Sequence, residues 1–106
     1  MAKGRPEAEN IPKVGDLASV AIGTDVYPYK VSYVSYAGSK LKLDPLVIGG
    51  KKHDDGLPGG EYEVKTDEEP DTENRQVLTA NYSAKKGMFT VGDHPVRVGA
   101  ARAYRD

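Results

Sequence analysis

The sequence contains no cysteine and no tryptophan, and seven tyrosines with a single phenylalanine make up its aromatic content. Without cysteine, a disulfide framework, a thiolate metal site and a cysteine nucleophile are all excluded. The longest apolar run, at residues 45–48, is far too short to span a bilayer. The N-terminal residues are charged and lack the apolar segment of a signal peptide, so we expect a chain that is not secreted and meets no membrane.

Length and charge set further bounds. A chain of 106 residues is the size of one ordinary domain. The net charge of −1 hides an uneven distribution, because seven acids and two bases lie between Glu61 and Arg75, whereas bases predominate from Gln76 onward. Such a split marks either a polyanion-binding face or a solvated acidic loop beside an ordinary basic surface. The slight net acidity disfavours nucleic acid as a partner.

The hydrophobic pattern has the two-residue period of β-strands, and glycine or proline interrupts every window that could form a longer helix. Two hairpins are predicted, one over residues 33–43 and one joining residues 76–82 to 88–91, whereas the glycine-rich residues 49–60 are predicted to form a long polar loop. Residues 1–13 are predicted to form an extended N-terminal arm. Residues 14–106 are predicted to form an all-β domain, a small SH3-like or related open barrel of five to seven short strands. The C-terminal tail from Gly99 is expected to be a helical turn or a last edge strand.

The tyrosine-rich segment from residue 27 to residue 36 is the most informative feature. Strand alternation places Tyr27, Tyr29 and Tyr33 on one face, away from Lys30 and Tyr36. These five residues are the candidate binding site. Three interpretations stay open: core or interface packing, a stacking platform for single-stranded nucleic acid, and a small-ligand pocket.

No set of catalytic residues is present in the sequence. The only imidazoles, His53 and His94, fall in predicted turns without a nucleophile motif nearby. His53, Asp54 and Asp55 could contact a hard cation, but they lack the spacing of a calcium-binding loop. We therefore expect neither an enzyme nor a bound metal or other cofactor.

Four short motifs resemble a family of small, uncharacterised proteins from bacteriophages and bacteria. The motifs are Gly15-Asp16, the run from Thr24 to Val31, the turn from Lys85 to Phe89, and the ending from Arg102 to Asp106. The resemblance spans most of residues 14–106, although Val26 and Phe89 stand where that family usually has arginine and tryptophan. It implies a phage setting, with the protein in the virion or the host cytoplasm, and it implies no catalytic activity.

Together these observations predict a non-enzymatic, phage-type structural or accessory module that acts through protein contacts, for example a capsid-decorating or virion-associated protein. Its partners would be other protein subunits, in a homo-oligomer or a larger assembly. Two alternatives remain: a host-directed binder that sequesters a nucleotide-like ligand or a defence protein, and a nucleic-acid-binding module.

Overall fold

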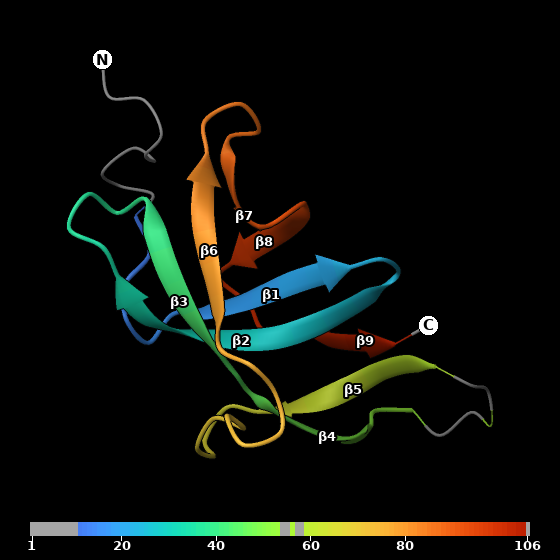
Figure 1. Ribbon diagram of the computed structural model, residues 1–106. Coiled ribbons are helices and arrows are strands. Elements are labelled where there is room, and N and C mark those ends of the chain that lie inside the picture. The colour runs from blue at the N-terminus through green and yellow to red at the C-terminus, as the bar shows by residue number, and fades with distance from the viewer. Residues whose placement is uncertain (1–10, 54–55, 57–58, 106) are drawn as a thin grey trace.

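The computed structural model describes residues 11–53, 56 and 59–105, and this part of the chain forms nine strands and no helix (Figure 1). No described segment is therefore a helix that could cross a membrane. The strands are β1 (Leu17–Ile22), β2 (Asp25–Val34), β3 (Lys40–Pro45), β4 (Val47–Lys51), β5 (Gly60–Lys65), β6 (Leu78–Ser83), β7 (Met88–Val91), β8 (His94–Val98) and β9 (Ala103–Arg105).

Six of these strands close into an antiparallel barrel in the order β1-β8-β7-β6-β3-β2, because β1 pairs with both β8 and β2. In the barrel, β2, β3, β7 and β8 each follow a neighbouring strand through a short turn, whereas β6 follows its neighbour β3 only after β4 and β5. The β1–β2 hairpin turns at Gly23, whose φ of 64° suits glycine. The prediction of a small all-β barrel is confirmed. The barrel is closed where an open one was expected. Its six strands fall within the expected five to seven, and three further strands lie outside the barrel.

The barrel core follows from the alternation in the sequence. In β3, Leu41 and Leu43 are fully buried and the intervening Lys42 is exposed, as predicted. Tyr82 and Phe89 pack edge to face, with ring centroids 5.4 Å apart. The buried cluster is made of Ala18, Val20, Tyr29, Val31, Leu41, Leu43, Ala80, Phe89 and Val96.

The remaining strands form a flange, defined here as β9, β5 and β4, which continues the sheet from the outer edge of β2. Val26 of β2 pairs with Tyr104 of β9, β9 pairs with β5, and β5 pairs with β4 (Figure 1). The expectation that residues 49–60 form one loop is wrong at both ends, since Gly49 and Gly50 lie in β4 and Gly60 begins β5. Pairing with β5 overrides the low strand propensity of glycine there, with a register irregularity between Ile48 and Lys51.

Both chain ends contribute to this arrangement. The tail after β8 becomes a strand, β9, but it lies between β2 and β5 and is no edge. Of the predicted arm, residues 1–10 lie outside the described residues, and Pro12 is buried. A Cβ at Gly38 would meet the Ile11 side chain at 2.8 Å, and Gly38 also has a φ of 75°. The β2–β3 turn therefore requires glycine for two separate reasons, and the end of the arm packs against it.

Replacing a core leucine measures how strongly the barrel interior holds the fold. Leu43→Ala leaves a cavity among fully buried neighbours, and we expect it to lower the free energy of unfolding by about 2–5 kcal/mol. The matched control is Val77→Ala, which truncates an apolar side chain that is 45% exposed, and its effect should stay within about 0.5 kcal/mol. Urea denaturation followed by circular dichroism gives both values. Equal effects would contradict the assignment of Leu43 to the core.

Candidate binding sites

The five residues of the predicted site do not share one surface. Tyr29 is buried in the barrel core and Tyr27 packs against that core, whereas Tyr33 is 46% exposed and Tyr36 is fully exposed in the β2–β3 turn. Lys30 lies half-buried on the face of β2 opposite Tyr29. The structure thus divides the predicted site between the barrel interior and two places on its surface.

A β-bulge in β2 explains why Tyr33 leaves the face of Tyr27 and Tyr29. Val31 pairs with Leu43, but Tyr33 pairs with the next partner, Lys42, so one extra residue is inserted between them. Val34 therefore packs against the core, and the expectation that Tyr33 faces the same way as Tyr29 is wrong. On the outer face, the Lys42 Nζ lies 5.9 Å from the centre of the Tyr33 ring, within range of a cation–π interaction.

At one end of the barrel, Arg75 covers the rings of Tyr27 and Tyr29. The Arg75 guanidinium carbon lies 4.9 Å from the Tyr29 ring centre and 5.5 Å from that of Tyr27. Its Nη1 donates a 2.8 Å hydrogen bond to the Leu46 carbonyl, and its buried Nη2 has no partner among the described residues. This arrangement holds the loop before β6 against the barrel.

An open pocket of about 320 Å³ lies at this barrel mouth, lined by Ile22, Tyr27, Tyr29, Arg75, Gln76 and Leu78. The Tyr27 hydroxyl donates to Asp25 Oδ2 at 3.1 Å, and burial, followed by this hydrogen bond, raises the pKa of Tyr27. A ligand that stacks on Tyr27 or Tyr29 from this pocket would compete with Arg75. The sequence showed Arg75 only as one of two bases in an acidic segment, and no spacing signal marked it as the residue over the tyrosines.

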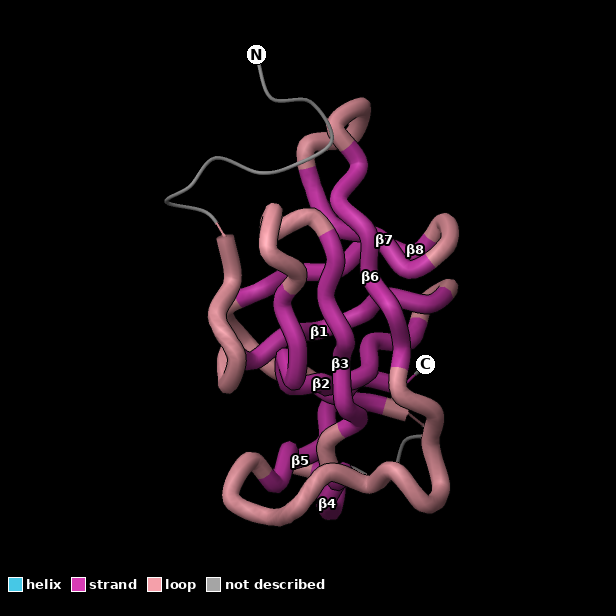
Figure 2. Tube along the Cα trace, turned by 60° about the vertical axis from the view of Figure 1, so that its left-hand side comes forward, coloured by secondary structure: helices cyan, strands magenta, loops and turns pink. Residues whose placement is uncertain are grey.

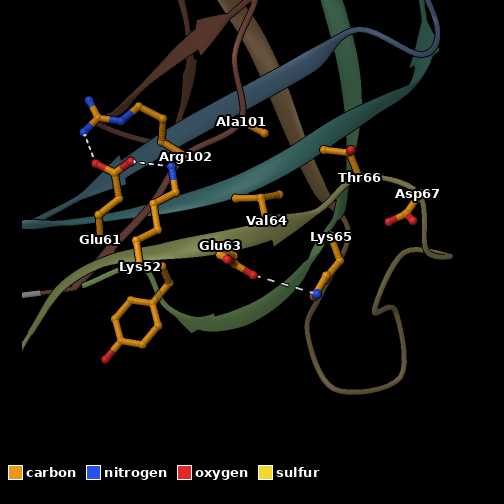
Figure 3. A pocket seen from close by; sticks show the side chains of 10 residues that line it. Lys52, Glu61, Glu63, Val64, Lys65, Thr66, Asp67, Ala101 and Arg102 are labelled. Carbon is orange, nitrogen blue, oxygen red and sulfur yellow. Dashed lines mark hydrogen bonds and ion pairs between the residues drawn. The ribbon is translucent and has the colours of Figure 1, made fainter. Parts of the chain in front are cut away.

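A second pocket, of about 450 Å³, lies along β5 of the flange (Figure 3). At one side of it, Glu61 has its Oε2 3.0 Å from the Lys52 Nζ and its Oε1 2.8 Å from an Arg102 Nη (Figure 3). The hydrogen bond from Arg102, followed by the one from Lys52, lowers the pKa of the Glu61 carboxyl. The Glu61 carboxylate is therefore kept ionised by its two ion-pair partners. This arrangement suits a structural role for Glu61 better than a role as a proton acceptor.

Ser19 places Arg102 in that bridge. The Ser19 hydroxyl donates to the Ala100 carbonyl at 2.7 Å and accepts from the Arg102 backbone N–H at 2.9 Å. The Gly99 N–H also donates to the Leu17 carbonyl at 2.7 Å. The tail is thereby fixed against β1 before it enters β9, and the flange is joined to the barrel by hydrogen bonds as well as by strand pairing.

The described residues contain no group of three or more histidine, aspartate or glutamate side chains able to hold a metal ion. His94 begins β8 opposite Val91, and His53 follows β4 in an exposed segment. Asp54 and Asp55, the other two members of the possible cation contact, lie outside the described residues.

The flange also ends on an open strand edge. Among the described residues β4 pairs only with β5 and stands last in the sheet, whereas closure of the barrel leaves no such edge on its six strands. An unpaired edge presents a row of backbone N–H and C=O groups that another strand can bind.

Comparison with known proteins finds no matching family model, no similar curated protein and no similar solved structure.

The Glu61 bridge makes stability depend on pH in a defined direction. Because the folded-state pKa lies below the ordinary value of 4.5, the bridge stabilises the fold above that pH and loses its effect as the pH falls through the folded-state pKa. Wild type should therefore exceed Glu61→Gln in unfolding free energy near neutral pH, and the difference should shrink under acid. Glu69→Gln, in the exposed loop, controls for the loss of one charge. A difference between wild type and Glu61→Gln that does not change with pH would contradict the bridge.

The arginine over the tyrosines should hold its loop in place. Arg75→Ala removes the ring contacts and the hydrogen bond to Leu46, so we expect a loss of about 1–3 kcal/mol in unfolding free energy. Cleavage of residues 66–74 by a glutamate-specific protease should also accelerate. Arg75→Lys should resemble the alanine variant, because lysine keeps the charge but lacks the planar group. Arg97→Ala, at an exposed arginine on β8, is the control and should change neither measurement.

Proposed function

We propose that this chain is a non-enzymatic structural or accessory module of a phage-type assembly, and that it binds a partner protein through the free edge of β4. The observation that carries the proposal is the contrast between a barrel without edges and a flange that ends on one. A domain that closes six strands into a barrel and ends its three-strand flange on an open edge has a specific place where a partner strand can add.

The composition of β4 suits such an addition. Val47 and Ile48 are half-buried, so their side chains could pack against a strand laid beside them. Gly50 is exposed, and a Cβ there would meet no atom within 4 Å. The backbone of Gly50 is thus open to close approach, and a partner would gain main-chain hydrogen bonds without displacing a side chain.

Two further points support the proposal from the sequence. The chain carries no cysteine and no nucleophile motif, which favours a contact role over catalysis. The resemblance of the Gly15-Asp16, Thr24–Val31 and C-terminal motifs to small bacteriophage proteins favours a virion or another phage assembly as the setting.

Changes at Gly50 test the edge directly. Gly50→Lys places a long charged side chain on the free edge, and we expect it to reduce co-sedimentation with virus particles from the strain that carries the gene by about tenfold. Gly50→Ala is the matched control, because its methyl group fits the open space, and it should bind as wild type does. Circular dichroism would verify that both variants fold.

Each outcome of this experiment is decisive. If wild-type protein fails to co-sediment with the particles, the virion role is wrong. If wild type and both variants co-sediment equally, the contact lies elsewhere and the role of the β4 edge is wrong.

A further inference from the structure

Two turns at one end of the barrel carry positive charge and no negative charge. Residues 35–43 and 78–90, which include the β2–β3 and β6–β7 turns, contain four lysines and no acidic residue. These turns lie at the same end of the molecule (Figures 1 and 2), and the Tyr82 N–H joins them by donating to the Ser39 carbonyl at 2.8 Å. We call this region the basic end, and its exposed cations are Lys40, Lys42, Lys85 and Lys86.

The basic end also presents aromatic surface. The bulge in β2 turns Tyr33 outward beside Lys42, and Tyr36 projects fully exposed from the adjoining turn. Neither Lys40 nor Lys85 forms an ion pair with a described residue. Unpaired cations beside exposed rings form a surface suited to an anionic partner that also carries apolar atoms.

The loop at the opposite end of the barrel carries only negative charge. Residues 66–74, here called the acidic loop, contain five acids and no base, and lie beyond the other end of β3 (Figures 1 and 2). The Asp71 N–H donates to the Pro45 carbonyl at 2.7 Å, and Arg75 anchors the end of the loop under the barrel. Lys65, which precedes the loop, pairs with Glu63, and Arg75, which follows it, lies over the tyrosine rings. The exposed Glu68 and Glu69 therefore have no ion-pair partner among the described residues.

We propose that the acidic loop of one copy docks on the basic end of the next, so that the protein associates head to tail. The two surfaces have opposite charge and lie at opposite ends of the barrel, so one molecule cannot pair its own. Both are held by the fold before they meet, which lowers the cost of ordering on association. The half-buried Pro70 offers apolar atoms to Tyr33 and Tyr36. Such a contact uses two different patches and so generates a ring or an open chain.

A second copy suits the basic end better than a nucleic acid does. Four lysines could attract phosphates, but the net charge of −1 provides no long-range attraction for a polyanion. The acidic loop of every other copy would also compete for the same cations. The inference deepens the proposed function by naming the partner of a second surface, and it uses none of the residues of the β4 edge.

Neutral variants of each surface test the contact. In sedimentation velocity at about 50 mM salt, the wild-type mass should rise with protein concentration, and at about 500 mM salt the protein should be monomeric, because salt screens exposed charges. Lys40→Gln with Lys42→Gln should be monomeric at both salt concentrations. Glu68→Gln with Glu69→Gln should be monomeric as well. A mixture of these two double variants retains one intact contact, so it should give a one-to-one dimer that grows no further.

The control is Arg97→Gln with Arg105→Gln, which removes two exposed positive charges outside the basic end and should associate as wild type does. A wild-type protein that is monomeric at low salt overturns the inference, as does a mixture of the double variants that forms no dimer. Loss of fluorescent oligothymidine binding in the lysine variant, with self-association unchanged, would assign the basic end to nucleic acid instead. Self-association abolished by Gly50→Lys would assign it to β4, so failure of this inference is distinguishable from failure of the proposed function.

Discussion

Strand β2 is the element on which the rest of the structure depends. One of its edges pairs with β1 from Asp25 to Lys30, and this pairing closes the barrel. The other edge of β2 pairs with β3 from Tyr29 to Val34 and with β9 at Val26. The flange therefore begins on the part of this edge that β3 does not cover. A single ten-residue strand therefore belongs to both the closed barrel and the open flange. The pairing of β2 therefore sets where the β4 edge of the flange lies relative to the basic end of the barrel.

Local alternation was sufficient to predict much of the barrel. In β3 the leucines and lysines alternate without interruption, and the structure buries the former and exposes the latter. The β6–β7 hairpin could be predicted equally well, because a turn with a glycine separates two segments of alternating hydrophobicity. The flange was harder to predict from the sequence, since β4 contains Gly49 and Gly50 and forms a strand through its pairing with β5. That pairing joins β5, where Tyr62 and Val64 alternate as in a strand, to a glycine-rich segment whose own sequence favours a loop.

The predicted site shows the same limit at the level of side chains. A strict two-residue period put Tyr33 with Tyr29, and the extra residue of the bulge reversed it. No residue type between Val31 and Val34 indicates a bulge in the sequence, because the bulge arises from how β2 and β3 pair.

The position of Arg75 could not be predicted from the sequence for a related reason. Its cationic group meets Tyr27 and Tyr29 only after the loop has been laid across the barrel end, a contact between residues distant in sequence.

The bulge has a further consequence for how this surface could change in evolution. Ser32 and Tyr33 stand between the inward Val31 and Val34, and both of them are exposed. Loss of the Ser32 codon would restore the regular period and leave Tyr33 on the exterior, whereas loss of the Tyr33 codon would restore the same period and remove the ring. Among related chains, a one-residue deletion in this segment would therefore leave the core in place, and the residue that is kept would decide whether an external ring is present.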